Sequence, residues 1–230
     1  MSEKIDSNTE LLILSAKAGD VSEVQRLIPL SDPTRNHSKA LQLAAEYGHV
    51  ECLKLLIPVS NPLDRKCRAL REAAEQGHTE CVALLIPVSI AENVLHESEP
   101  LRWAAYAGHL ECVKLLLPVS DPAHYDSQAL RWAAHHGHTE CVRLLIPGSN
   151  PTDRNSRALQ NAALGQHYEC VDLLYDISNV FEAIEALKIN SPNNYERWGF
   201  LEQRWMAEQQ NKVLSQHITT SAPAAGARKL

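Results

Sequence analysis

The stretch AAHHGHTECVRLLIP (133–147) has four near-copies elsewhere in this chain. They are AAEYGHVECLKLLIP (44–58), AAEQGHTECVALLIP (73–87), AAYAGHLECVKLLLP (104–118) and AALGQHYECVDLLYD (162–176). Each copy is too short to bury its own apolar face, so neighbouring copies must stack on one another. The sequence therefore predicts an elongated solenoid, whose long open surface suits binding better than catalysis.

The composition agrees with one array of this kind. Of the 230 residues, 44% are apolar and 22% are charged, and the net charge is −6. This acidic balance argues against general binding to nucleic acid or to an anionic membrane, because both need a basic surface. The first ten residues, MSEKIDSNTE, are polar, and no apolar run approaches the roughly 20 residues of a membrane span. We therefore expect no signal peptide, no membrane span and a cytoplasmic location.

Glycines set the register of the repeat. They stand 29, 29, 31 and 29 residues apart, at Gly19, Gly48, Gly77, Gly108 and Gly137. Ten residues before each of them, and before Gln166 in the last copy, the chain carries Thr9, Ser38, Cys67, Ser98, Ser127 and Ser156. A hydroxyl at this place is expected to cap the first helix of its unit. Proline is expected to end the second helix, at Pro29, Pro58, Pro87, Pro118 and Pro147.

Within a unit, two apolar stripes predict a pair of helices. Leu130, Ala133 and Ala134 occupy positions i, i+3 and i+4, so they share one face of the first helix. The small alanines let neighbouring first helices approach closely. Cys141 and Leu145 belong to the apolar face of the second helix, which completes the core.

The repeated pattern ALxxAAxxGHxECVxLLI resembles the ankyrin repeat over about residues 9–180. That family's repeat is about 33 residues long. The residues missing here fall after the second helix, where the family builds its β-hairpin finger. The resemblance therefore implies an all-α, ankyrin-type helical-repeat solenoid with shortened fingers and a C-terminal capping helix. The recurring LLIPVSDP segment also makes the chain similar to bacterial or phage-borne members of the family.

The array is expected over residues 9–184 in six units: 9–37, 38–66, 67–97, 98–126, 127–155 and 156–184. The third unit holds two extra residues in an irregular loop near 90–97. A helical segment over 185–217 is expected to cover the open end of the array with Trp198, Leu201 and Trp205, because solenoid ends expose apolar surface. Residues 218–230 read as a disordered tail.

Five cysteines share one position on the apolar side of the second helix: Cys52, Cys81, Cys112, Cys141 and Cys170. Stacked helices lie about 8–10 Å apart, which is too far for the Cα atoms of a disulfide. We therefore expect buried, unbridged thiols that pack as small apolar side chains. Cys67 replaces a capping serine, and it is expected to be more exposed and the thiol to test for reactivity.

Five histidines follow the turn between the two helices: His49, His78, His109, His138 and His167. The family resemblance implies a structural hydrogen-bonding role for them. The group His135, His136, His138 and Cys141 raises the alternative of a metal site, but a helix break divides it and no metal-ligand spacing accompanies it. We expect no metal and no cofactor. No catalytic motif is present, so no enzymatic activity is predicted.

Positions that differ between units are expected to mark the exposed face of the first helices, opposite the Leu/Ala stripe. Seven of these positions carry Trp, Tyr or Arg, which are enriched in binding hot spots, and two histidines lie next to them. The nine candidate partner-binding residues are Tyr47, Arg71, Arg102, Trp103, Tyr106, Arg131, Trp132, His135 and His136. The resemblance points to the same side, since ankyrin proteins commonly bind partners on the concave surface of first helices and fingers.

The two tryptophans have an alternative interpretation. Trp103 and Trp132 could fill space left by the shortened fingers, because aromatic side chains usually bury most of their area. Glu72 and Asn161 hold the same position in other units. A fully buried site would not accept them without partners, which favours partly exposed tryptophans in a contact patch.

The sequence therefore favours a non-catalytic protein–protein interaction module that masks or scaffolds one partner protein. Its expected setting is a bacterial or phage effector, immunity or inhibitor protein. Two alternatives stay open. One is binding of nucleic acid or a nucleotide through the Arg/Trp/His stripe, against which the acidic net charge weighs. The other is structural self-assembly through the C-terminal helix, which would make a dimer of the expected monomer.

Overall fold

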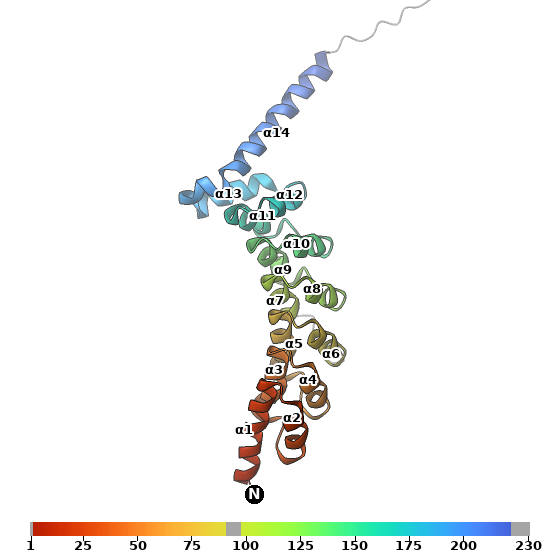
Figure 1. The fold of residues 1–230 in the computed structure, drawn as a ribbon. Helices are drawn as coiled ribbons and strands as arrows, with labels where there is room; N and C mark the ends of the chain where they lie inside the picture. The colour runs from red at the N-terminus through yellow and green to blue at the C-terminus, as the bar shows by residue number, and fades with distance from the viewer. Residues whose placement is uncertain (1, 91–97, 222–230) are drawn as a thin grey trace, which may run out of the picture.

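The computed structural model describes the backbone of residues 2–90 and 98–221. First helices stack in one column: α1 (Ser2–Ala18), α3 (Arg35–Glu46), α5 (Asp64–Gln76), α7 (Glu99–Ala107), α9 (His124–His135) and α11 (Asp153–Gly165) (Figure 1). Second helices stack beside them: α2 (Val21–Leu27), α4 (Val50–Leu56), α6 (Thr79–Ile90), α8 (Leu110–Leu116), α10 (Thr139–Leu145) and α12 (Tyr168–Tyr175). Two further helices follow, α13 (Val180–Asn190) and α14 (Tyr195–Ser221). The described ranges contain no strand, so the all-α solenoid is confirmed.

One apolar core runs the length of the array. It includes a fully buried leucine from every first helix: Leu12, Leu41, Leu70, Leu101, Leu130 and Leu159. The alanine pairs beside these leucines are also buried, and their small size lets each first helix pack against the next, as α9 does against α11. Because each unit covers its neighbour, burial continues from unit to unit without a large core in any one of them.

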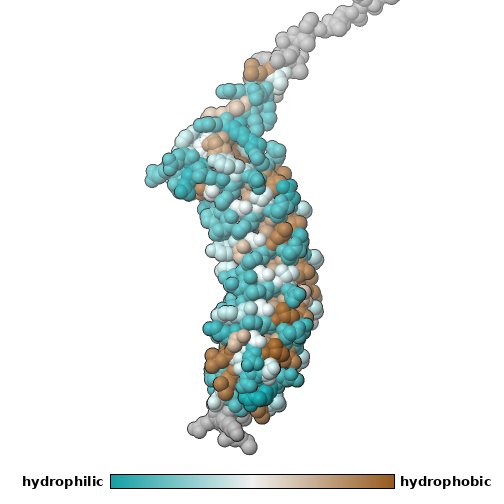
Figure 2. All heavy atoms as spheres, in the orientation of Figure 1, coloured by the Kyte–Doolittle hydropathy of each residue, from teal (hydrophilic) through white to brown (hydrophobic). Residues whose placement is uncertain are grey.

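Figure 2 shows the outside of this elongated body as mainly hydrophilic. Hydrophobic residues form a broken band along the side of the even-numbered helices. Within 2–90 and 98–221, no helix combines the length and the apolar character that crossing a bilayer requires.

Proline ends the second α-helix in four units, as predicted. In those units one turn of 3₁₀-helix, with proline as its second residue, follows the α-helix: η1 (Ile28–Leu30), η2 (Ile57–Val59), η4 (Leu117–Val119) and η5 (Ile146–Gly148). The prediction is wrong for Pro87, which lies inside α6, and α6 continues to Ile90. The buried Ser89 hydroxyl donates to the Leu85 carbonyl at 2.8 Å, which helps to hold this last turn. From residue 91 on, the irregular loop predicted near 90–97 lies outside the described residues.

The glycine of one unit packs against the histidine of the next and so joins the two units. Gly48 adopts φ +74, a left-handed conformation, and a Cβ there would lie 2.5 Å from Nδ1 of His78 in the next unit. The other ring nitrogen of His78 lies 3.0 Å from the Glu46 carbonyl oxygen. His49, His138 and His167 make the equivalent contact with a carbonyl 32 residues earlier, so the structural hydrogen-bonding role is confirmed for these four histidines.

The shortened fingers are replaced by left-handed turns that the sequence did not predict. Three consecutive non-glycine residues have positive φ at 36–38, 65–67, 125–127 and 154–156. Each such residue costs roughly 1–2 kcal/mol in this conformation. Stacking against the next loop must offset that cost, and the contacts of the serines show how.

Three of these turns end in serine and the turn at 65–67 ends in Cys67. The expectation that these serines and Ser98 cap their own helices is wrong. Ser98 makes no capping hydrogen bond, and its Oγ accepts from the Asp121 amide at 2.8 Å. Ser38, Ser127 and Ser156 accept in the same way from Asn61, Asn150 and Asn179, each 23 residues further along. Thr9 lies within α1 rather than at its start, and its Oγ1 accepts from Asp32. These hydroxyls tie the start of one first helix to the loop that leads into the next.

The C-terminal helices cover the last unit. Trp198 and Leu201 of α14 are buried, and the Trp198 indole donates to the Ser191 carbonyl at 3.1 Å, whereas Trp205 is only half-buried. Beyond this contact α14 leaves the array and projects from its end (Figure 1). It runs to Ser221, through the first residues of the segment expected to be a tail, and residues 222–230 lie outside the described ranges.

Candidate functional site

One position on the first helix differs sharply between units. It carries Leu43, Glu72, Trp103, Trp132 and Asn161 in successive units. Leu43 and Glu72 are buried, and the other three are half-buried. The same place on the same scaffold therefore serves as core in two units and as partly open surface in three.

Trp103 and Trp132 come together with neighbouring rings on α7 and α9. The ring centroids of the two tryptophans are 5.4 Å apart, and Tyr106 lies 5.6 Å from Trp103 and 5.5 Å from Trp132. His136 packs edge-on against Tyr106 at 4.4 Å, and His135 follows at 4.8 Å from His136. We call these five residues the aromatic plaque. Tyr106 is 40% exposed and both histidines are exposed, so the plaque reaches solvent.

One member of the plaque, His136, has a pKa shifted toward the neutral imidazole. Partial burial and the neighbouring rings of His135, His138 and His167 lower the pKa of His136 below its usual value. A neutral imidazole packs on the Tyr106 ring without the desolvation cost of a charge. The plaque can therefore offer contiguous apolar and aromatic area to a partner.

The arginines flanking the plaque are occupied inside the protein. Arg131 donates to the carbonyl oxygens of Asp126 and Tyr125, both at 2.9 Å, and so holds its own left-handed turn. Arg102 donates to Gln128 at 2.6 Å and lies over the Tyr125 ring at 4.6 Å. Both guanidinium groups therefore already have structural contacts, while the Nε of Arg102 is buried without a partner among the described residues.

The contact that Arg131 makes with its own turn recurs in two other units, where Gln42 and Gln160 make it. Each glutamine holds the position equivalent to Arg131 and donates to the carbonyl five residues earlier, that of His37 or Asn155. Both are buried. The expectation that variable positions mark the exposed face is therefore wrong here, because the turn supplies a partner for the buried amide.

Glu72 is the other exception, and it corrects the argument against filler tryptophans. It is 9% exposed, yet its carboxylate accepts from Arg68 and Arg71, each at 2.9 Å. Burial opposes ionisation, but these hydrogen bonds prevail and lower the pKa of Glu72. Arg71 also reaches Glu99 on α7 at 3.1 Å. A buried site thus accepts a charge when partners are provided, so Glu72 alone does not show that the position is open.

Tyr47 lies apart from the plaque. Its ring is 45% exposed, stacks on His49 at 6.4 Å between centroids and lies under the Lys17 ammonium at 5.4 Å. The nine predicted residues therefore divide into three groups: the five residues of the plaque, three arginines with hydrogen bonds inside the protein (Arg71, Arg102 and Arg131), and Tyr47 alone. The structure brings only the first group into continuous contact.

The cysteines behave as core residues. All six are free and buried. Cys67 is only 1% exposed, so the expectation that it is the more exposed thiol is wrong. Burial raises its pKa, which disfavours the reactive thiolate. Among the described residues no three His, Cys, Asp or Glu side chains are arranged to hold a metal ion.

Comparison with known proteins agrees with this architecture. A family model described as ankyrin repeats in three copies matches residues 59–128 and 101–184, and one described as a single ankyrin repeat matches 36–67. Among solved structures, the crystal structure of the human ASB11 ankyrin repeat domain is similar, with a TM-score of 0.62 and 25% sequence identity. The match covers 72% of this chain and 82% of that one. The comparison with curated proteins gives no match.

Proposed function

Because the chain belongs to the ankyrin repeat family, whose repeats are generally protein–protein interaction modules, we propose that it binds a partner protein through the aromatic plaque. In this proposal the protein is a non-catalytic, monomeric cytoplasmic module that masks or scaffolds its partner. An effector, immunity or inhibitor protein of bacterial or phage type would act in this way.

One observation carries the proposal. Two neighbouring units place tryptophan where the other units have a buried leucine, a satisfied glutamate or a half-buried asparagine, and the two rings touch each other while remaining half-exposed. Aromatic side chains give a large contact area at a low cost in conformational entropy, and Trp and Tyr are enriched in binding hot spots. The exposed part of Tyr106 extends the same surface.

The charge distribution supports a protein partner over nucleic acid. The chain carries 28 acidic and 22 basic residues. Arg102 and Arg131, the cations beside the plaque, are engaged with Gln128 and with backbone carbonyls. Binding of nucleic acid would need free cations to replace counterions along the phosphates.

Capture from a lysate of the native host, followed by mass spectrometry, tests the proposal. The bait is the full chain, compared with a Trp103→Ala/Trp132→Ala variant and with a matched Lys114→Ala/Arg143→Ala control. The control residues lie on α8 and α10 with exposed side chains in local ion pairs. We expect one protein to be retained by the wild type and the control and lost from the tryptophan variant. Retention by all three baits would contradict the proposal, and salt-sensitive capture of oligonucleotides would favour the nucleic-acid alternative.

A second candidate function is self-assembly through α14. Beyond its contact with the array, this helix exposes Met206, Val213 and Leu214. An unpartnered apolar face on a projecting helix is a common basis for helix pairing. Light scattering after size exclusion tests it: a dimer that dissociates on changing Val213 and Leu214 to Gln would support self-assembly, and a monomer at high concentration would exclude it.

A further inference from the structure

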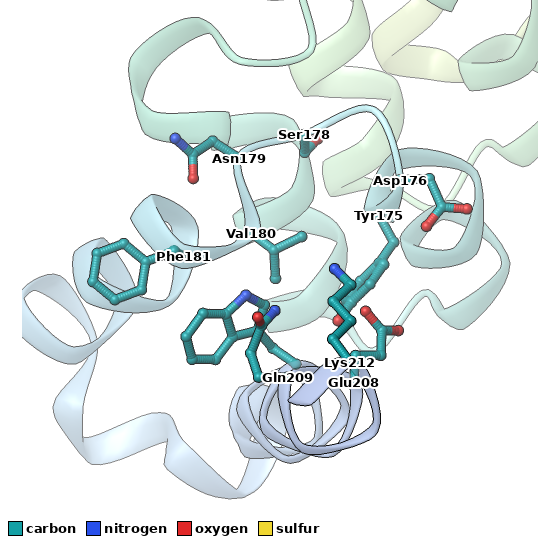
Figure 3. Close-up of a pocket in the computed structure, with 10 residues that line it drawn as sticks. Tyr175, Asp176, Ser178, Asn179, Val180, Phe181, Glu208, Gln209 and Lys212 are labelled. Carbon is teal, nitrogen blue, oxygen red and sulfur yellow. The ribbon is translucent and has the colours of Figure 1, made fainter. Parts of the chain in front are cut away.

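A hollow of about 380 Å³ lies where the last helix pair meets α14. One wall is the segment between α12 and α13, and the other is a face of α14 (Figure 3). Figure 3 shows Tyr175 and Val180 facing Glu208, Gln209 and Lys212 across this space.

The sequence departs from its own repeat at this place. Four earlier copies have Ile57, Ile86, Leu117 and Ile146 where the last copy has Tyr175. The tyrosine ring is 3% exposed and lies under the Arg204 guanidinium, 3.9 Å from its centroid. The substitution therefore brings a hydroxyl into a junction that is aliphatic in the other units.

Two buried hydroxyls at the hollow lack hydrogen-bond partners. The oxygens of Tyr175 and Ser178 are both buried, and neither has a partner among the described residues. Two equivalents of Ser178 do have one, since Ser60 donates to the Pro33 carbonyl at 3.5 Å and Ser149 to that of Pro122 at 3.4 Å, whereas a third equivalent, Ser120, also lacks a partner among the described residues. Buried polar groups without partners are rare and costly, so the Tyr175 hydroxyl, which has no counterpart in the four earlier copies, indicates a missing partner at this hollow.

The protonation state of Tyr175 suits a donor. Burial, together with the Glu208 carboxylate nearby, raises the pKa of Tyr175 to about 12. The hydroxyl is therefore protonated at neutral pH. The Glu208 carboxylate lies close enough to act on it, but the Tyr175 oxygen has no hydrogen bond of good geometry among the described residues. The charge of Glu208 is offset by Arg204, whose Nε lies 3.5 Å from the carboxylate.

The remaining lining supplies a cation and an apolar wall. Lys212 forms no ion pair within the described part of the chain, and its ammonium group stands beside Tyr175 in Figure 3. The rings of Phe181 and Trp205 lie 5.6 Å apart on the other side, next to the buried Val180. The Tyr175 hydroxyl and the Lys212 ammonium therefore face an aromatic wall, and the carboxylates of Asp176 and Glu208 also line the hollow.

We propose that this hollow binds the carboxylate end of a ligand with an aromatic or other apolar body. The carboxylate accepts hydrogen bonds from the Tyr175 hydroxyl and the Lys212 ammonium. The body lies against Phe181 and Trp205. This site lies beyond the last unit, away from the plaque on α7 and α9, and it does not depend on the proposed partner binding.

Calorimetric titration of the full chain with 3-phenylpropionate tests the proposal, with the neutral 3-phenylpropionamide as the matched probe. We expect saturable binding of the acid and at least about tenfold weaker binding of the amide, since one charge-assisted hydrogen bond accounts for such a factor. Equal binding of the two probes, or no binding of the acid, would overturn the proposal.

Two variants test whether 3-phenylpropionate binds at this hollow. Tyr175→Phe removes only the hydroxyl and keeps the ring under Arg204, and Lys212→Met removes the charge and keeps the stem. Each should weaken the acid about tenfold, whereas Lys114→Met on α8 should not. Without ligand, Tyr175→Phe should melt no lower than the wild type, because it removes a buried hydroxyl that has no partner. Unchanged affinity in both variants would show that the acid binds elsewhere.

A third arm identifies the natural source of the carboxylate. A short peptide ending in a free C-terminal Phe is compared with its amidated form. Preference for the free peptide supports a protein C-terminus as the ligand. Binding of 3-phenylpropionate without binding of either peptide supports a free small acid.

Discussion

The units containing α5 and α7 use the same helix position in opposite ways. In α5, Glu72 is buried and its charge is satisfied by Arg68 and Arg71. In α7, Trp103 is half-buried and its contacts are with Trp132 and Tyr106 of the plaque. The comparison teaches that a unit whose polar groups are paired internally has few free groups for binding a partner. The plaque, by contrast, still has exposed aromatic surface that a partner can bury.

Removing Glu72 should cause the largest loss of stability. Glu72→Ala leaves two guanidinium groups partly buried without their shared carboxylate, so we expect a loss of roughly 3 kcal/mol in the free energy of unfolding. Denaturant titration measures it. Glu75→Ala is the matched control on the same helix, since Glu75 is only half-buried and its pKa is raised by burial and by the nearby carboxylate of Glu72. Similar losses of stability in the two variants would mean that the Glu72 ion pairs contribute no more to folding than an unpaired glutamate on the same helix.

The two plaque tryptophans should be energetically coupled. Each single change, Trp103→Ala or Trp132→Ala, removes their ring contact, so the double variant should lose less stability than the two singles added together. We expect a coupling of about 1 kcal/mol, within the range of aromatic pairs. A double-mutant cycle in urea provides the value. Strict additivity would show that the two rings pack independently.

The turn-holding role of Arg131 predicts a smaller, selective effect. Arg131→Gln should cost little, because Gln42 and Gln160 make the same contact with a carbonyl five residues earlier. Arg131→Met should cost about 1 kcal/mol, since it leaves the turn carbonyls without this donor. Melting of both variants provides the comparison. If the Gln variant were as unstable as the Met variant, the guanidinium charge itself would matter.

The smallest expected effect is a pH dependence that comes from His136. Its pKa in the folded protein is lowered from 6.5, so the unfolded chain binds the proton more readily. The corresponding stability is present above pH 6.5 and declines as the pH falls through the folded-state pKa. Because the ring is exposed, the slope should be shallow. Replacing His136 with Gln should flatten it, and an unchanged slope would assign the effect to other groups.

Much of this architecture could be predicted from the repeats, because stacking forces the Leu and Ala positions of every unit into the same environment. The left-handed turns could not be predicted in that way. Non-glycine residues such as Asn36 and His37 avoid positive φ locally, and only the serine bond to the next loop shows what supports them. The roles of Gln42 and Glu72 also escaped the pattern, since variation between units does not distinguish an exposed side chain from a buried one with a partner.

The most direct test compares affinity with stability in two variants. Once the partner is captured, calorimetry should show that Trp132→Ala weakens binding by about 2 kcal/mol or more, the level of a hot spot. Under conditions where it remains folded, Glu72→Ala should lose stability but keep the wild-type affinity. Such a double dissociation would place the binding energy on the plaque. Loss of affinity in Glu72→Ala together with full affinity in Trp132→Ala would contradict the account and move the binding surface to α5.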